Sequence, residues 1–98
     1  MGNMGLESLR QHRREILDAA ARHGVRDVRV FGSIARGDDD ENSDVDLLVD
    51  VEPGRTLLDV IGFEQDLQQL LRRHVEVLTD GGLSPYLQQR ILAEAAPL

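Results

Sequence analysis

The chain has 98 residues, no cysteine and a formal net charge of −7 at pH 7. This length allows one hydrophobic core, so we expect a single domain over residues 1–98. The lack of cysteine excludes disulfides and thiolate metal sites, and the acidic charge argues against direct binding of nucleic acid. No apolar run approaches the roughly 20 residues that cross a membrane, and no leader pattern is present, so we expect a cytoplasmic protein.

The small size and the basic residues restrict the oligomeric state and the chemistry that we expect. A chain of this length buries only about 60–70% of the surface that its unfolded form exposes. We therefore expect either a homo-oligomer or a hetero-oligomer with a partner protein. All 11 basic residues are arginine, and the lack of lysine excludes a P-loop and Schiff-base chemistry.

The first third of the chain predicts a helix followed by a strand. Apolar residues recur at helical spacing from Leu6 to Ala20, which indicates one amphipathic helix that Gly24 stops. Residues 25–31 then alternate between apolar and polar side chains, as a half-buried strand does. A glycine and a serine end this strand, and residues 34–43 are expected to form a polar loop that allows a helical turn at its start.

The rest of the chain predicts two further strands and two helices. Residues 44–50 and 74–79 alternate in the manner of strands. Thr56 is expected to cap the helix between them, with Asp59 as its capping-box partner, and Arg72-Arg73 marks the end of that helix. Ser84 as cap and Pro85 at the first helical position begin a last helix that runs through Ala95.

Helical spacing also predicts which apolar side chains of the helices are buried. They are Leu6, Leu9, Ile16, Leu17 and Ala20 in the first helix, Leu57, Val60, Ile61, Leu67, Leu70 and Leu71 in the second, and Leu87, Ile91 and Leu92 in the last.

The predicted order is α-β-β-α-β-α, which indicates an α/β fold. If Ser33 at the end of strand one is to meet Asp44 at the start of strand two, these strands must run antiparallel. The long helix between strands two and three instead suits a parallel crossover. We therefore expect a mixed sheet with a core of three strands, flanked by helices.

Two acidic residues on the second predicted strand point to a metal site. Asp44 and Asp46 are two apart, so they project from the same face. Unpaired carboxylates held this way disfavour each other's ionisation, and a divalent cation removes the conflict. Mg²⁺ suits such a pair because it keeps several waters and takes further ligands from a substrate phosphate. If strand three lies beside strand two, Glu76 joins them, and three acids on adjacent strands could hold two metal ions.

The end of the first strand offers a place for phosphate. Gly32 permits close backbone approach, and exposed N–H groups with the hydroxyl of Ser33 can cradle a triphosphate. Arg36 either contacts that phosphate or pairs with the acidic run Asp38–Glu41. We interpret the run itself as a solvated loop. The three histidines, at positions 12, 23 and 74, are expected at the surface or its boundary, because nothing places them at ligand spacing.

The combination of these features resembles the signature of the polymerase-beta-like nucleotidyltransferase superfamily. Gly32-Ser33 is followed after ten residues by Asp44-x-Asp46, then by a helix and a third acid on a further strand. The stretch FGSIARGDDDENSDVDLLV, residues 31–49, is similar to the minimal nucleotidyltransferase (MNT) branch, and the resemblance extends from about Leu17 to Ala95.

The resemblance implies the polymerase-beta-like fold and a set of site residues. Gly32 and Ser33 would bind the nucleotide triphosphate, with Arg36 and Ser43 as further nucleotide-binding residues. Asp44, Asp46 and the third acid would be the catalytic residues and would hold Mg²⁺, as two ions, with ATP as the substrate. The third acid is commonly aspartate in this superfamily. Here it is Glu76, which is one methylene longer and can still bind Mg²⁺ or serve as the base.

The resemblance also implies a partner and two functional hypotheses. Small members of this branch are typically paired with a helical HEPN toxin, an RNase, and act as its antitoxin. Their activity resembles AMP transfer from ATP to a tyrosine of the toxin. The first hypothesis is therefore a protein adenylyltransferase. The alternative is a non-catalytic antitoxin that neutralises the toxin by direct contact, which the change to Glu76 and the small core both favour.

Overall fold

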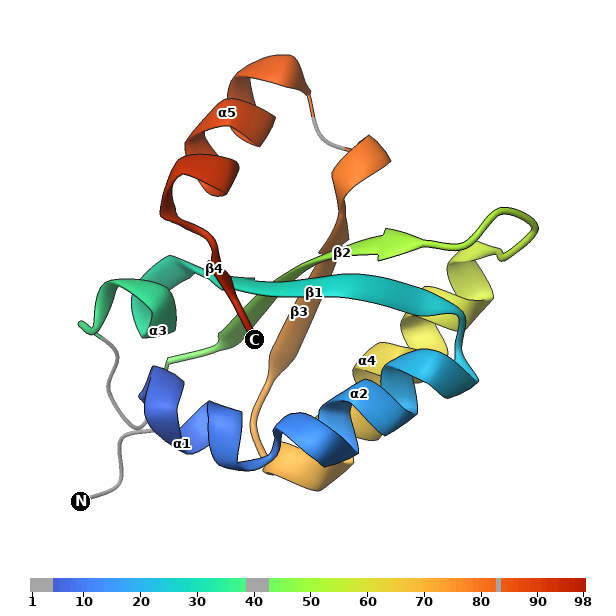
Figure 1. The fold of residues 1–98 in the computed structure, drawn as a ribbon, viewed down its shortest axis with the longest axis horizontal. Coiled ribbons are helices and arrows are strands. Elements are labelled where there is room, and N and C mark those ends of the chain that lie inside the picture. The colour runs from blue at the N-terminus through green and yellow to red at the C-terminus, as the bar shows by residue number, and fades with distance from the viewer. Residues whose placement is uncertain (1–4, 39–42, 83) are drawn as a thin grey trace.

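The computed structural model describes residues 5–38, 43–82 and 84–98, and Figure 1 shows its helices and strands. The helices are α1 (Leu6–Gln11), α2 (Arg13–Arg22), α3 (Gly32–Arg36), α4 (Leu57–Leu71) and α5 (Pro85–Glu94), with a 3₁₀ turn, η1, at Asp80–Gly82. The strands are β1 (Val25–Phe31), β2 (Val45–Val51), β3 (Val75–Thr79) and β4 (Ala96–Pro97).

The strands form one mixed sheet in the order β3-β2-β1-β4. β1 pairs antiparallel with β2, and β2 pairs parallel with β3, which confirms the predicted topology. The crossover from β2 to β3 runs through α4, because neighbouring parallel strands need a long connection. The sheet therefore places the starts of β2 and β3 next to the end of β1.

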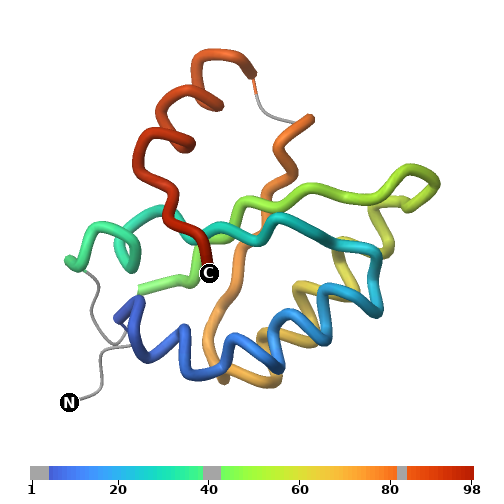
Figure 2. The backbone as a smooth tube through the Cα atoms, in the orientation of Figure 1, coloured from blue at the N-terminus to red at the C-terminus, as the bar shows by residue number. Residues whose placement is uncertain are grey.

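A fourth strand was not predicted. After α5 the chain returns to β1, where Ala96 pairs antiparallel with Val30 and Pro97 with Arg29. Figure 2 shows this C-terminal segment passing from α5 back to the middle of the molecule. Two residues, one of them a proline, are too short to give the alternation by which a strand is recognised.

The first predicted helix is two helices in the structure. α1 ends and α2 begins on either side of His12, whose backbone (φ −96°, ψ 12°) is not helical. The apolar spacing continues across this residue, so periodicity alone gave no sign of the break. Leu9 and Ile16, one on each side of it, are both fully buried.

The segment after β1 also differs from the expected loop. Gly32 to Arg36 form the short helix α3, which starts directly at the glycine and ends at Gly37 in the left-handed conformation (φ 80°). The prediction allowed a helical turn but placed it after the glycine and serine. The acidic run that follows lies largely outside the described residues, since the structure describes only Asp38 of it.

One face of the sheet carries the hydrophobic core. Figure 1 shows α2 and α4 on one side of the strands and α5 on the other. The largest fully buried side chain is Phe63 on α4, which was not among the residues predicted to be buried. Around it pack the buried side chains of α1, α2, α4 and the inner face of the strands, including Leu9, Ile16, Val30, Leu47, Val49, Leu67 and Val75.

Several side chains that were expected inside are exposed. Leu57 is 72% exposed and Ile61 41%, and Leu58 beside them is 78% exposed. Leu17, Leu87 and Leu92 are also exposed. In α5, which lies wholly within the described residues, no side chain is buried. The prediction of inward-facing residues was therefore wrong for α5, because this helix projects from the sheet instead of covering it.

The predicted helix starts are confirmed. Thr56 and Asp59 form the expected capping box, in which the Thr56 N–H donates to Asp59 Oδ2 at 3.0 Å. At α5, Ser84 Oγ accepts from the Leu87 N–H at 3.3 Å, and Pro85 occupies the first helical position. Among the described residues, no helix combines the length and apolar character that a membrane crossing requires.

Candidate active site at the start of strands β2 and β3

The second and third acids lie side by side at the start of the parallel strand pair. Asp46 of β2 is in register with Glu76 of β3. In-register residues of parallel strands project from the same face, so both carboxylates point away from the core that Leu47 and Val77 help to form. Asp46 is half-buried and Glu76 is exposed. The long helix α4 between these acids in sequence therefore does not separate them in space.

Asp44 joins this pair from the residue before β2 begins. Its effect is visible in the electrostatics, because burial, Glu76 and Asp44 together raise the pKa of Asp46 from 3.8 to about 6. Burial is the largest of the three causes, and the two carboxylates follow it. Arg36 and His74 oppose the shift. The three acids thus form one electrostatic cluster in which the most enclosed member resists ionisation.

The chemistry of this cluster fits a divalent cation. No salt bridge from an arginine within the described residues neutralises Asp44, Asp46 or Glu76. Carboxylate oxygens are the ligands that Mg²⁺ prefers. The cluster is not a closed cage, however: across the described ranges no three acidic or histidine side chains have the spacing of a preformed metal site.

Gly32 lies directly against this cluster. Its φ of +76° belongs to the left-handed region, and a Cβ added to it would overlap Asp46 Oδ2. The preceding residue, Phe31, is the β1 partner of Asp46. A glycine is therefore needed here for two reasons, the backbone conformation and the closeness of the carboxylate. The bend at the end of β1 and the acids on β2 consequently belong to one site.

The other predicted nucleotide-binding residues lie around this bend. Ser33 is the second residue of α3 and is partly exposed, and Ser43 stands just before Asp44. Arg36 closes α3 and is exposed. Its Nε donates to Asp38 Oδ2 at 3.3 Å, so of the two alternatives for this residue the structure shows the pairing with the acidic run. The hydrogen bonds with Asp38 and then with Glu94 raise the pKa of Arg36.

Glu94 is the residue of this region that sequence reasoning missed. It lies at the end of α5, where its Oε1 accepts from the Gly32 N–H at 3.1 Å. Arg36 Nη1 also donates to its two carboxylate oxygens, at 3.4 and 3.3 Å. Glu94 is the one acidic residue of α5, but the pattern of that helix gives no sign of a contact with Gly32. The contact depends on how α5 returns to β1, which local sequence does not encode.

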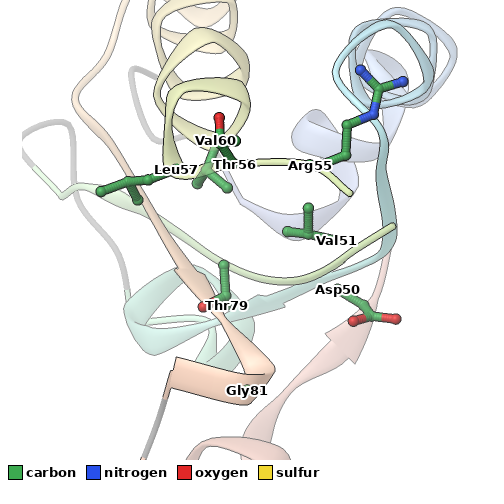
Figure 3. A pocket seen from close by; sticks show the side chains of 8 residues that line it. All are labelled: Asp50, Val51, Arg55, Thr56, Leu57, Val60, Thr79 and Gly81. Atoms are coloured by element: carbon green, nitrogen blue, oxygen red, sulfur yellow. The ribbon is translucent and has the colours of Figure 1, made fainter. Parts of the chain in front are cut away.

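A hollow of the surface lies at the other end of the same strands. It has a volume of about 320 Å³. Figure 3 shows its lining side chains, which come from the end of β2, the end of β3 and the start of α4. The acids lie at the strand starts, so this pocket is separate from them. The lining residues are Asp50, Val51, Arg55, Thr56, Leu57, Val60, Thr79 and Gly81.

Comparison with known proteins gives a consistent result along the whole chain. The profile of the nucleotidyltransferase domain family matches residues 9–97. The chain is 38% identical over 88 residues to a candidate protein adenylyltransferase of Methanocaldococcus jannaschii, covering 90% of this chain and 95% of that protein. It is also 38% identical over 86 residues to the protein adenylyltransferase MntA of Thermococcus cleftensis, covering 88% of this chain and 84% of the relative.

Solved structures show the same fold. A candidate minimal nucleotidyltransferase superposes with a TM-score of 0.86 at 49% identity, covering 97% of both chains. A toxin-antitoxin structure with AMP-PNP superposes with a TM-score of 0.74 at 20% identity, covering 86% of this chain and 69% of the other. At that identity the second likeness supports the fold alone.

Proposed function

The chain belongs to the nucleotidyltransferase domain family, and we propose from that premise that it is an antitoxin that transfers AMP from ATP to a partner toxin. We assign the partner to the HEPN class of RNases and the acceptor to a tyrosine hydroxyl. The names of the relatives support transfer to a protein. The observation that carries the proposal is the in-register pair Asp46 and Glu76, with Gly32 against Asp46.

The proposed reaction is a displacement at the α-phosphorus of ATP. The acceptor oxygen forms a bond to this phosphorus while the bond to the oxygen that bridges to the β-phosphate breaks, and pyrophosphate leaves with the electron pair. The proton of the acceptor hydroxyl passes to Glu76, whose exposed carboxylate is open to an incoming side chain. The protein contributes mainly by positioning and by the arrangement of charge.

The other site residues bind the nucleotide and the metal, and Glu76 is a metal ligand in addition to the proton acceptor. Gly32 and Ser33 receive the β- and γ-phosphates at the bend after β1, with Arg36 and Ser43 beside them. Asp44, Asp46 and Glu76 would hold Mg²⁺, as two ions. When bound, the metal neutralises the charge of the triphosphate and of the three carboxylates. This arrangement also accounts for a half-buried acid, Asp46, that forms no salt bridge with a cationic side chain among the described residues.

The need for a protein partner follows from what the fold leaves uncovered. Glu76 is exposed, and α5 buries none of its own described side chains. Large apolar side chains are exposed on two helices, including Leu57 and Leu58 on α4 and Tyr86 on α5. A partner that packs against such side chains would cover apolar surface that the fold leaves exposed, and one that extends from there to the acids at the strand starts would complete the site.

A non-catalytic antitoxin is the second candidate. Two observations favour it: the same exposed apolar side chains, and a third acid, Glu76, that belongs to no preformed metal cage. In this case the protein would neutralise its partner by covering it, and the carboxylates would be dispensable.

One experiment separates the two functions. The chain is incubated with its partner toxin, Mg²⁺ and ATP labelled in the α-phosphate, and the label on the toxin is measured beside rescue of cell growth. We expect the double variant Asp44→Asn, Asp46→Asn to lose transfer by at least about 100-fold and to lose rescue. Undiminished labelling would end the catalytic proposal, and rescue without labelling would support the non-catalytic antitoxin.

A matched control keeps the change in net charge constant. Glu7 on α1 and Asp18 on α2 are both exposed and belong to helices that carry none of the site residues. The double variant Glu7→Gln, Asp18→Asn should therefore retain wild-type transfer. A similar loss in this control would mean that total charge, not the site, determines activity.

A further inference from the structure

We infer that the carboxylate of Glu94 occupies the place of a nucleotide phosphate and has to leave before nucleotide binds. This inference rests on the proposed function and adds a regulatory step to the same site. The Glu94 contact, as we use the term, comprises the hydrogen bonds from the Gly32 N–H and the Arg36 guanidinium to the Glu94 carboxylate.

The donors in this contact are those that a phosphate requires. An oxygen of Glu94 lies 3.1 Å from the Gly32 nitrogen, and the same carboxylate lies 3.3 Å from Arg36 Nη1. A backbone N–H at a glycine bend together with a guanidinium is a common phosphate-binding combination. Carboxylate and phosphate present similar anionic oxygens, so one excludes the other from these donors. While Glu94 is in place, the proposed β/γ-phosphate position is taken.

The surroundings of Glu94 also suit an anion larger than a carboxylate. A cavity of about 220 Å³ lies beside it, lined by Arg36, Arg90, Glu94 and two apolar side chains of α5. Small-molecule sites usually measure about 300–1,000 Å³, so this one takes part of a nucleotide rather than a whole one. Without the Glu94 carboxylate its charged lining consists of two guanidinium groups. That lining matches a polyphosphate tail.

The helix that carries Glu94 buries little of its own surface. Figure 2 shows α5 projecting from the strands on the side opposite α2 and α4, with its last turn nearest α3. None of its side chains, all in the described range, is buried. Besides the Glu94 contact, a hydrogen bond of 2.6 Å from Gln88 Nε2 to Asp80 Oδ1 holds it. The end of α5 continues into β4, which pairs with β1, so moving the Glu94 side chain, and not the whole helix, costs few buried apolar contacts.

The test compares Glu94→Gln with wild type in binding of two probes, each with Mg²⁺. The probes are inorganic tripolyphosphate and α,β-methylene ATP, in which the bond that breaks during transfer is replaced. Glutamine keeps the shape and removes the charge. We expect the dissociation constant of both probes to fall by about threefold to tenfold, as expected when a competing closed state is removed. Glu7→Gln, the matched control on α1, should bind both as wild type does.

The competing interpretation is that the Glu94 contact only anchors α5. In that case Glu94→Gln would lower the melting temperature and leave binding unchanged or weaker, and this result would overturn the inference. Absence of probe binding in both wild type and variant would overturn it as well. Tighter binding of tripolyphosphate by the variant, in a protein that transfers no AMP to any partner, would support the inference while the proposed function fails.

A second measurement uses the unmodified chain and does not depend on how the variant folds. Tripolyphosphate is added to wild-type protein while the backbone amide resonances are followed by NMR. We expect the resonances of residues 92–94 to shift together with those of Gly32 and Arg36, because the phosphate displaces Glu94. A shift at Gly32 with no change in residues 92–94 would overturn the inference.

Discussion

The two faces of the sheet differ in the kind of side chains that they carry. The face under α2 and α4 is filled with apolar side chains around Phe63, and it contains no buried polar or charged side chain among the described residues. The other face presents Asp46 and Glu76, and the helix above it, α5, buries none of its residues in the described range. One face therefore contains the main core, while the other buries Leu48 and carries the acids that we assign to substrate and partner.

The alternation of β2 produces this division within one strand. Val45, Leu47 and Val49 point into the core and are fully buried, while Asp46 between them points to the open face. Strong packing on one side holds the backbone of β2 firmly. That rigidity allows carboxylates to be kept close together on the other side although they repel each other. The stability of one face thus supports the chemistry of the other.

Truncation of a side chain in the core face should cause the largest loss of stability. Phe63→Ala removes the largest fully buried side chain and leaves a cavity, so we expect the free energy of unfolding to fall by about 3–5 kcal/mol. Urea unfolding measures this change. Leu58→Ala, on the same helix but 78% exposed, should change stability by no more than about 0.5 kcal/mol. Equal losses in the two variants would contradict the division into faces.

Gly32→Ala should disturb the open face with a smaller cost to the fold. The left-handed backbone at this position, φ +76°, makes a side chain unfavourable by about 1–2 kcal/mol. The new Cβ would also displace the carboxylate of Asp46, so we expect transfer to drop by about 100-fold. Urea unfolding and the labelled-ATP assay measure the two effects.

Gly37→Ala provides the control for this variant. Gly37 has a similar backbone, φ +80°, but apart from its chain neighbours no described residue has an atom within 4 Å of the position that a Cβ would take there. The control should therefore lose comparable stability while it keeps transfer. If Gly37→Ala lost transfer equally, backbone strain in α3 would be the cause and the closeness of Gly32 to Asp46 would be irrelevant.

The acids of the open face should lower stability at alkaline pH. The pKa of Asp46 in the folded protein is about 6, above the ordinary value of 3.8, so the folded state binds this proton more tightly than the unfolded state. Protonation of Asp46 therefore stabilises the fold as pH falls through about 6, and its charge destabilises the fold above that pH. Asp46→Asn should consequently be more stable than wild type at pH 8, with a smaller difference at pH 5.

Thermal melting in a metal-chelating buffer at the two pH values checks this expectation. Asp18→Asn, an exposed change on α2, serves as control and should show no such pH dependence. A lower stability of Asp46→Asn at pH 8 would mean that the carboxylate has a favourable partner, against the repulsion described here.

The sequence predicted the strands and their pairing, because these features follow from local patterns. Alternation at 25–31 and 44–50 gave the strands, and the requirement that Ser33 meet Asp44 gave their antiparallel pairing, which the structure confirms. The parallel pairing that brings Glu76 into register with Asp46 was also correctly expected. The roles of these acids stay predictions.

What the sequence did not predict depends on distant contacts. Leu57 and Leu87 have core-like spacing, yet both are exposed, because periodicity identifies an apolar face without saying what covers it. Phe63, by contrast, has the same helical spacing as Val60 and Leu67, so the pattern contained this core residue although it was not predicted. The Glu94 contact joins residues 62 positions apart, and it follows from the way β4 returns the chain to β1. No local pattern contains that information.

The most direct test of the account is to locate a divalent cation on the wild-type chain. Mn²⁺ is titrated in place of Mg²⁺, and the paramagnetic broadening of backbone amide signals is recorded by NMR. We predict selective broadening at Asp44–Asp46, at Glu76 and at Gly32-Ser33, and its loss in Asp46→Asn. Broadening elsewhere, for example around Asp50 and Glu52, or broadening that survives in Asp46→Asn, would contradict the claim that these three acids form one metal site.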